Sequence, residues 1–211
     1  MTETTRESAE QAGRGVRLPR TERRAQLLAS AQDVFVANGY HAAAMDEIAD
    51  RAGVSKPVLY QHFPGKLELY LALLQQKVEE MVSRVNAAIE STTDNKLRVH
   101  AAVAAYFDFV NSEDGSFRLV FESDLRGEAA VEQTIDHAMS RCVELIAEAV
   151  TADAGLDPER ASLVAMGLVG LSQVTARYWL TRNRLVPQEE AVELIASLAW
   201  RGISGFPLQH P

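Results

Sequence analysis

The sequence is poor in cysteine and contains no long hydrophobic run. Cys142 is its single cysteine among 211 residues, so no disulfide can form within the chain and a packed core has to stabilise the fold. The longest apolar run, residues 163–171, contains two glycines and is far shorter than the roughly 20 residues of a membrane-spanning helix. Because the first 20 residues also lack the apolar centre of a secretory signal, we expect a soluble cytoplasmic protein.

Signs of strands, of repeats and of catalytic machinery are missing as well. No run alternates apolar and polar residues between turn signals, and no segment of about 20 to 50 residues recurs. No two of the five histidines lie four residues apart with a carboxylate between them, and Cys142 has no glycine-rich surroundings. We therefore expect no enzyme, no cofactor and no metal site.

Basic charge is in short supply: 21 Lys and Arg stand against 29 Asp and Glu, a net charge of −8. The distribution is uneven, however. Residues 14–66 hold eight basic and five acidic side chains, whereas residues 67–211 hold 12 basic and 21 acidic ones. A basic segment carried by an acidic body predicts that nucleic acid binds near the N-terminus and is repelled elsewhere.

What the sequence does contain is helical periodicity. A first helix is expected from Thr21, which can cap it, to Gly39, a residue type that ends helices. Asp157 and Pro187 mark two later helix starts. The pattern predicts an all-α fold of about nine helices, the others covering residues 45–52, 56–63, 66–89, 96–111, 116–125, 128–153, 158–182 and 188–203.

Residues 46–63 are typical of a helix-turn-helix. Ala49 leaves room where the second helix crosses the first, Gly53 tolerates the positive φ of a tight turn, and Ser55 can cap the second helix. The outward residues of that helix suit the major groove, where Lys56 could read guanine and Gln61 adenine. A surface hairpin with ordinary polar residues is the alternative. The expected DNA contacts are Arg20, Arg23, Met45, Ser55, Lys56, Pro57, Val58, Tyr60, Gln61, His62 and Lys66.

An arginine-rich arm precedes this motif. Residues 1–18 have almost no apolar content and predict a flexible, basic-ended arm. Its arginines and those that begin the first helix could follow a phosphate backbone or enter a minor groove, or they could simply aid solubility. They are Arg14, Arg17, Arg20, Arg23 and Arg24.

The stretch from Phe35 to Tyr70 combines several specific motifs: Asn38-Gly39-Tyr40, Met45-Asp46-Glu47-Ile48-Ala49, Gly53-Val54-Ser55-Lys56 and Leu59-Tyr60-Gln61-His62-Phe63. This combination resembles the TetR family of bacterial transcription regulators. The resemblance implies DNA contacts by the matching residues from Lys56 to Lys66. One departure is that Ala43 and Ala44 stand where many members have a Thr or Ser that caps a helix and touches phosphate. That contact is therefore expected to be lost or to be replaced by backbone N–H groups.

The resemblance also implies an Ω-shaped homodimer that pairs through its last two long helices and encloses an effector pocket. Segments such as Phe107-Asp108-Phe109 and Gly155-Leu156-Asp157-Pro158 are similar to actinobacterial members that control fatty-acid synthase genes and sense long-chain acyl-CoA. We therefore expect three domains or segments, namely the arm (1–18), a helix-turn-helix domain (19–66) and an effector-binding and dimerisation domain (67–211). The alternative is a repressor of an efflux or catabolic gene that responds to a different hydrophobic molecule.

Within residues 67–211, aromatic and apolar side chains are the candidates for an acyl-chain pocket, although each could equally be ordinary core. The candidates are Val103, Tyr106, Phe107, Val110, Phe117, Phe121, Met139, Cys142, Leu163, Met166 and Gln173. Helix 158–182 is apolar on more than one face, which predicts a subunit interface or, alternatively, a monomeric core. The expected interface residues are Gly167, Gly170, Val174, Tyr178, Val192, Ile195, Ala199 and Trp200. A helical lipid carrier without DNA activity is a further alternative.

Overall fold

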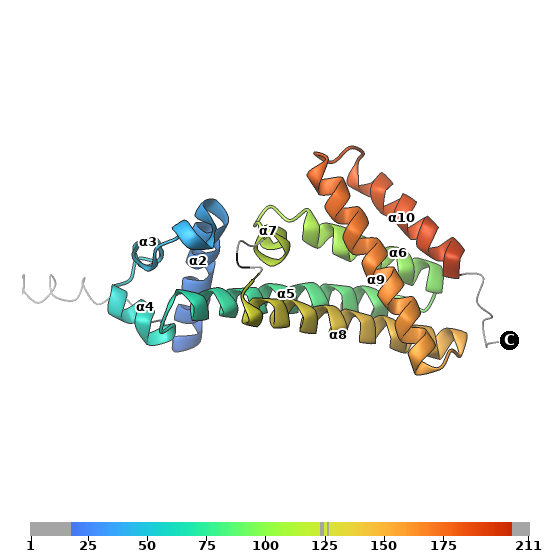
Figure 1. Ribbon diagram of the computed structural model, residues 1–211, viewed down its shortest axis with the longest axis horizontal. Helices are drawn as coiled ribbons and strands as arrows, with labels where there is room; N and C mark the ends of the chain where they lie inside the picture. Colours follow the sequence, from blue (N-terminus) through green and yellow to red (C-terminus); the bar gives the residue numbers. More distant parts are fainter. Residues whose placement is uncertain (1–17, 123–124, 126, 204–211) are drawn as a thin grey trace, which may run out of the picture.

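The computed structural model describes residues 18–122, 125 and 127–203, and in these residues it contains nine helices and no strand (Figure 1). The predicted all-α fold is confirmed. Most of the arm, with Arg14 and Arg17, lies outside the described residues. The helices are α2 (Arg20–Ala42), α3 (Met45–Arg51), α4 (Lys56–His62), α5 (Lys66–Glu90), α6 (Asn95–Val110), α7 (Ser116–Phe121), α8 (Ala129–Ala154), α9 (Pro158–Thr181) and α10 (Gln188–Ile203).

Helix ends follow the predicted signals in most places. Gly39 breaks α2 with φ 74°, although one further turn continues to Ala42. Asp157 caps α9 by accepting a hydrogen bond from the Arg160 N–H. The cap predicted at Thr21 is wrong, because α2 begins one residue earlier, where the Pro19 carbonyl accepts from the Arg23 N–H at 2.9 Å. Helix α7 ends at residue 121, short of the predicted 125, because the chain turns polar there.

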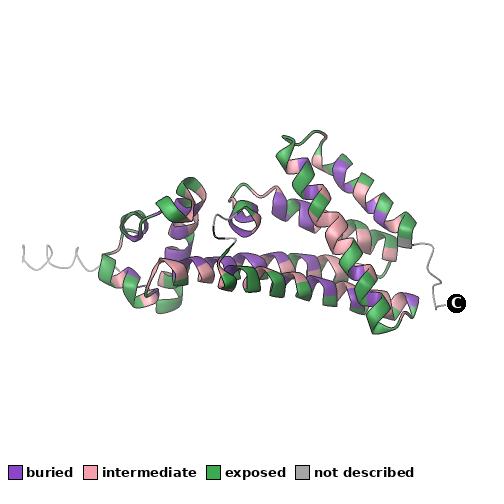
Figure 2. Ribbon diagram, in the orientation of Figure 1, coloured by how far each residue is buried: buried purple, intermediate pink, exposed green. Residues whose placement is uncertain are grey.

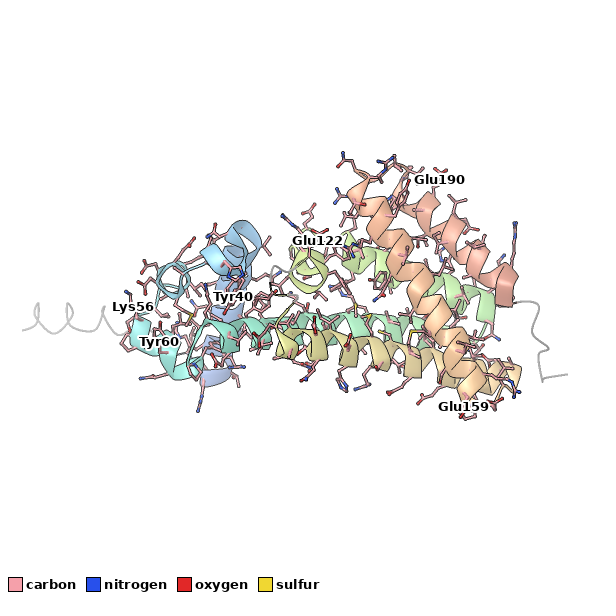
Figure 3. All side chains as sticks on the ribbon, in the orientation of Figure 1. Tyr40, Lys56, Tyr60, Glu122, Glu159 and Glu190 are labelled. Atoms are coloured by element: carbon pink, nitrogen blue, oxygen red, sulfur yellow. The ribbon has the colours of Figure 1, made fainter. Side chains whose placement is uncertain are left out.

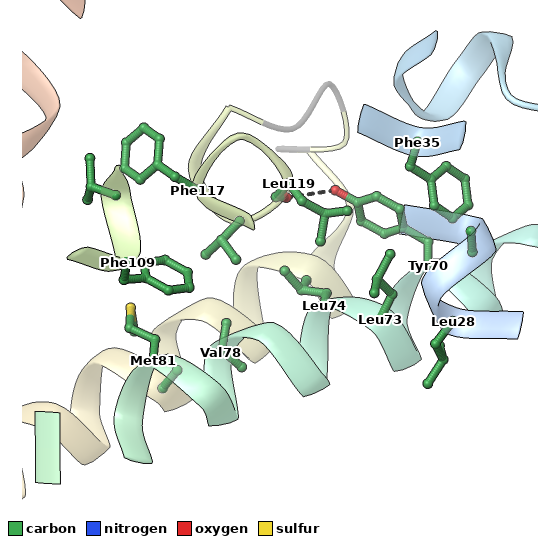
Figure 4. Close-up of a cluster of buried hydrophobic side chains, with 14 of the residues drawn as sticks. Leu28, Phe35, Tyr70, Leu73, Leu74, Val78, Met81, Phe109, Phe117 and Leu119 are labelled. Atoms are coloured by element: carbon green, nitrogen blue, oxygen red, sulfur yellow. Dashed lines mark hydrogen bonds between the residues drawn. The ribbon is translucent and has the colours of Figure 1, made fainter. Parts of the chain in front are cut away.

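The long helix α5 is the axis of the molecule. It begins beside α2 and α4 and runs to the far end, where α6, α8, α9 and α10 gather (Figure 1). Its buried residues follow one side of the helix, as the purple segments show (Figure 2). Leu73, Leu74, Val78 and Met81 belong to a single hydrophobic cluster that extends from α2 into the larger helical body (Figure 4). Each fully buried side chain of this size contributes about 1.5–3 kcal/mol to folding.

The loop between α6 and α7 is fastened onto α2 and α5. The Gln32 side-chain amide of α2 donates to the Asp114 carbonyl at 2.6 Å, and the buried Lys77 ammonium of α5 lies 3.1 Å from the Asp114 carboxylate. The Tyr70 hydroxyl donates to the Leu119 carbonyl of α7 at 2.9 Å (Figure 4). Helix α6, through the loop that follows it, is thereby connected to the first helix of the N-terminal unit.

Asp114 is held as a carboxylate at this junction. Burial alone would raise the pKa of Asp114, but hydrogen bonds from Ser116 and its neighbours outweigh that effect and hold the pKa well below its usual range. At the next residue, Gly115 has φ +72°, and a Cβ there would lie 2.6 Å from the Val36 side chain of α2. The loop therefore approaches α2 more closely than any other residue type permits without a shift.

Candidate nucleic-acid interface and internal cavity

The helix-turn-helix is built around α3 and α4. Ile48, Ala49 and Leu59 are fully buried where the two helices meet. In the turn between them Gly53 has φ 64°, and the Val54 N–H donates to the Ala49 carbonyl at 3.0 Å. A small residue at the crossing and a glycine in the turn let α4 pack across α3 with its outer face free of the core.

The outer face of α4 carries most of the predicted DNA contacts. Pro57 and Gln61 are exposed, and so are Lys56 and Tyr60, which project from this end of the molecule (Figure 3). Val58 is half-buried on the same helix. Such a surface offers donors to phosphate and base edges together with small apolar groups for thymine methyls.

Arginines at the start of α2 lie beside α4. Arg20 and Arg23 line a shallow pocket together with Val58, Gln61 and His62. The pKa of His62 is lowered, mainly by partial burial and to a smaller extent by the positive charges of Arg20, Arg24 and Arg23. The structure thus brings the arginines at the start of α2 and the outer face of α4 to one positively charged surface.

At the start of α4, Ser55 does not form its predicted cap, and Lys56 is paired with an acidic residue. Ser55 occupies the N-cap position, but its side chain makes no capping hydrogen bond, so the predicted cap is wrong. Lys56 forms an exposed ion pair with Asp46 at 2.6 Å, and this hydrogen bond raises the pKa of Lys56. Exposed pairs of this kind are weak, so Lys56 can exchange Asp46 for a phosphate or a base.

Two of the predicted DNA contacts, Met45 and Lys66, are engaged within the protein and do not lie on the exposed face of α4. Met45 is 9% exposed and belongs to the hydrophobic core. The Lys66 ammonium donates to the backbone carbonyls of Tyr40, His41 and Ala43 at 2.7–3.2 Å and lies 4.5 Å from the centre of the Tyr40 ring. Its three N–H donors are therefore engaged at the end of α2, and Lys66 acts as a clamp between α2 and α5.

A second feature is an apolar cavity of about 180 Å³ in the larger helical body. It contains the predicted Val103, Tyr106, Met139 and Cys142. Helices α5, α6, α8, α9 and α10 all contribute to its wall. The lining residues are Val85, Ile89, Asn95, Arg98, Val99, Ala102, Val103, Tyr106, Met139, Cys142, Ile146, Ala149, Val150, Asp153, Ala154, Leu168, Val169, Ser172, Ala199 and Trp200.

The other predicted pocket residues lie elsewhere. Phe107, Val110 and Phe117 are buried in the core but do not line the cavity, and Phe121 packs against the ring of Tyr106 from outside it. Gln173 is half-buried and its amide contacts the Met139 sulfur.

Leu163 and Met166, also predicted in the pocket, are 76% and 56% exposed on α9. Their placement in the cavity is therefore corrected. They lie on the side of α9 opposite its buried alanines Ala161 and Ala165, which pack toward α8.

Sequence reasoning missed the polar end of this cavity. The Arg98 guanidinium bonds to the Asp153 carboxylate, to Asn95 Oδ1 at 2.9 Å and to the Ile89 carbonyl at 3.1 Å. Arg98 thus holds together the ends of α5, α6 and α8. A lone arginine in the mostly apolar helix 96–111 was the signal that could have pointed to it.

Helices α9 and α10 expose an apolar outer face. Val174 and Tyr178 from the predicted interface lie on it, beside Gly167. On α10 the exposed residues are instead Leu194 and Leu198. Two predicted interface residues, Val192 and Ala199, are buried inside the chain, Ile195 and Gly170 are half-buried, and Trp200 lines the cavity. The residues predicted on α10 thus face the interior of this chain, because an apolar stripe does not reveal which neighbour it faces.

Family models match both parts of this architecture. Residues 27–73 match the model described as bacterial regulatory proteins of the tetR family, and residues 95–202 match a tetracyclin repressor-like C-terminal domain. The chain belongs to the TetR family. As a TetR protein it is a transcriptional regulator that binds operator DNA, and it is not an enzyme.

Individual TetR relatives narrow the comparison. The chain is 51% identical over 195 residues to the HTH-type transcriptional activator FasR of Mycolicibacterium smegmatis, which covers 92% of this chain and 89% of that protein. A TetR-like regulator from Rhodococcus sp. RHA1 superposes with a TM-score of 0.70 at 29% identity, covering 90% of this chain and all of that one. FadR of Bacillus subtilis, solved in complex with stearoyl-CoA, superposes with a TM-score of 0.69 at 19% identity. The match covers 86% of this chain and 98% of the FadR chain.

The described part of this TetR chain contains neither a membrane-spanning helix nor a cluster of metal-ligating side chains. Within residues 18–122, 125 and 127–203, no helix is long and apolar enough to cross a bilayer. The same residues contain no group of three or more His, Cys, Asp or Glu side chains arranged to hold a metal ion.

Proposed function

We propose that the protein is a homodimeric cytoplasmic regulator of fatty-acid synthesis genes whose affinity for operator DNA changes when a long-chain acyl-CoA occupies the cavity. The observation that carries this proposal is the apolar cavity with a single charged end, in a chain 51% identical to the activator FasR. An apolar tunnel suits an acyl chain, and a polar mouth suits the group to which the chain is attached. The stearoyl-CoA complex of the structural neighbour FadR supports the same class of effector.

Residues 19–66 act in this proposal as the DNA-binding domain and residues 67–211 as the effector-binding and dimerisation domain, with the arm ahead of both. Helix α4 enters the major groove. Lys56, Tyr60 and Gln61 contact phosphates and base edges, while Arg20 and Arg23 contact the adjoining backbone. Met45 and Lys66 support this surface from within instead of touching DNA.

The outer face of α9 and α10 is the proposed dimer interface. Leu163, Met166 and Val174 of α9 lie with Leu194 and Leu198 of α10 on a surface that a monomer would leave in water. A two-fold partner covers such a face and places the two α4 helices in successive major grooves, about 34 Å apart.

The effector changes DNA affinity by moving helices. The cavity of about 180 Å³ is smaller than the roughly 300 Å³ of an ordinary small-molecule site, so a long acyl chain has to part the helices around it. Helix α6 lines the cavity and continues into the loop that Gln32 and Lys77 hold against α2 and α5. Because the effector binds best to the widened arrangement and operator DNA to one particular spacing of the two α4 helices, linkage requires that the effector shift the affinity for DNA.

The test is the affinity for operator DNA, measured by fluorescence anisotropy with and without stearoyl-CoA. We expect a change in Kd of at least about fivefold, the usual lower range of such coupling. Ala102→Phe, which fills the cavity, should abolish the response, whereas Ala101→Phe on the same helix but outside the lining should retain it. An affinity that no long-chain acyl-CoA alters would contradict the effector assignment and would favour the alternative of an efflux or catabolic repressor.

A further inference from the structure

The Tyr106 hydroxyl is buried but has no hydrogen-bond partner in the described part of the chain. Tyr106 lies on α6, lines the cavity and is only 6% exposed. Among the residues that the structure describes, its oxygen is the one buried side-chain nitrogen or oxygen atom that has no hydrogen-bond partner. A buried donor without a partner is costly, so such groups commonly mark a position that a ligand or an ordered water completes.

Tyr106 lies at the deep end of the cavity. On α6 the lining changes from half-buried at Arg98 to fully buried at Val103 and Tyr106. On the facing helix α8, Asp153 is half-buried and Cys142 is buried, whereas Ala154 beside Asp153 is buried and Met139 beyond Cys142 is half-buried. We therefore take the Arg98–Asp153 pair, the charged part of the lining, as the entrance, and eight residues of helix place Tyr106 about 12 Å from it.

The surroundings of Tyr106 favour a neutral ligand atom. Burial raises the pKa of Tyr106 above its ordinary value and that of the nearby Cys142 to about 11, so both groups keep their protons at neutral pH. The cationic Arg98 is eight residues away along α6 and is already bonded to Asp153. Arg177, whose charge opposes the rise in the pKa of Tyr106, is exposed and does not line the cavity. A carboxylate at this depth would lie unpaired in an apolar wall, whereas a carbonyl or hydroxyl oxygen could accept the tyrosine proton.

We propose that Tyr106 determines specificity by donating a hydrogen bond to a neutral oxygen on the effector's chain, so that the protein prefers an oxygenated acyl chain to a plain one. This inference rests on the proposed function for the orientation of the ligand, with its coenzyme end at the Arg98 entrance and its chain toward Tyr106. The keto group is the best fit, because it accepts a hydrogen bond and adds no donor that would itself need a partner.

The experiment compares full-length wild type with Tyr106→Phe, which removes only the hydroxyl. Binding of stearoyl-CoA and of a series of mono-oxo-stearoyl-CoAs, with the keto group moved along the chain, is measured by titration calorimetry. We expect at least one oxo isomer to bind wild type about tenfold more tightly than the variant. Stearoyl-CoA should bind the variant as tightly as wild type or more tightly, since an unpaired polar group has been removed.

A second readout separates a hydrogen bond from a change in cavity shape. The stretching frequency of the ¹³C-labelled keto carbonyl should be lower in the wild-type complex than in the Tyr106→Phe complex. Thermal unfolding followed by circular dichroism confirms that the variant is folded. The inference would be overturned if both proteins bound every ligand with equal affinity, or if the variant lost equal affinity for plain and oxo chains. It would also be overturned if the carbonyl frequency were the same in both complexes, as expected when a water molecule already accepts the Tyr106 hydrogen bond.

Failure of the proposed function gives a different result. If stearoyl-CoA binds neither protein, the acyl-CoA assignment fails, and Tyr106 is tested with dodecan-2-one against dodecane, which carry no coenzyme. The ketone should then raise the unfolding temperature of wild type more than that of Tyr106→Phe, while dodecane should not distinguish the two. Equal stabilisation of both proteins by the ketone would reject the role of Tyr106 independently of any acyl-CoA.

Discussion

The two ends of the molecule differ in how complete they are. In α2, α3 and α4, Tyr60 is the one large apolar side chain among the described residues that is strongly exposed. The body formed by α5 to α10 exposes several others, mainly on α9 and α10, and contains the unpartnered Tyr106. The apolar side chains of the first region are covered by its own packing, and the surface that it presents is polar and suits DNA. The second region instead leaves apolar side chains and a buried hydroxyl without partners in the described part of this chain.

The largest effect that distinguishes the two regions should come from truncating one leucine in each. Leu59→Ala removes a fully buried side chain from the helix-turn-helix and should lower the free energy of unfolding by about 2–5 kcal/mol. Leu97→Ala, at a 57% exposed position of α6, should change it by less than about 0.5 kcal/mol. Urea unfolding measures both. Similar losses would mean that the N-terminal unit does not depend on its small core.

The second prediction concerns the exposed face of the body. Leu194→Glu combined with Leu198→Glu places two charges on this face and should weaken self-association by more than about 2 kcal/mol. Sedimentation velocity should show a shift from dimer to monomer, while circular dichroism should stay unchanged because neither residue is in the core. Leu97→Glu is the matched control on a different exposed surface. A dimer that survives the double substitution would place the interface elsewhere.

The junction between the regions supplies the third prediction. Gly115→Ala puts a Cβ about where the Val36 side chain lies and leaves a non-glycine residue at φ +72°. The expected cost is about 1–3 kcal/mol of stability, together with a weaker response of DNA affinity to the effector. Adding Val36→Ala relieves the clash but not the backbone strain, so it should restore part of the loss. No recovery would show that the close contact is unimportant.

The smallest effect tests the different roles of two lysines. Lys56→Gln should weaken DNA binding on all sequences and reduce the slope of log K against log salt concentration by about one. Lys66→Gln should leave that slope unchanged and should instead lower the unfolding temperature, since three backbone carbonyls lose their donor. Anisotropy titrations at several salt concentrations distinguish them. If both variants reduced the slope equally, Lys66 would contact DNA, as the sequence predicted.

Local features of the sequence predicted most of the fold. The helices fall within a few residues of their predicted positions because glycines and prolines interrupt the periodicity clearly, as at Gly39, Gly53 and Pro158. Contacts between distant segments were not predictable in the same way. The clamp from Lys66 to Tyr40 joins residues 26 positions apart, and nothing in either local pattern indicates it.

The internal cavity shows the same limit. Val103 and Tyr106 on α6 were predicted to line it, but Val85 of α5 and Ile146 of α8 were not. Periodicity identifies an apolar face without naming the helix that it meets. The prediction that Val192 of α10 lies at an interface has the same origin, since Val192 is buried within the chain whereas Leu194 is exposed.

The length of helix α5 determines how far a small movement at the cavity is transmitted to the DNA-binding end. Its 25 residues span about 37 Å, from Lys66 beside the DNA-binding surface to residues that line the cavity. A stiff rod of that length acts as a lever: a tilt of five degrees at one end displaces the other by about 3 Å, which is the length of a hydrogen bond. In the proposed mechanism, a modest parting of the helices around an acyl chain would therefore be magnified into a misfit between α4 and its groove.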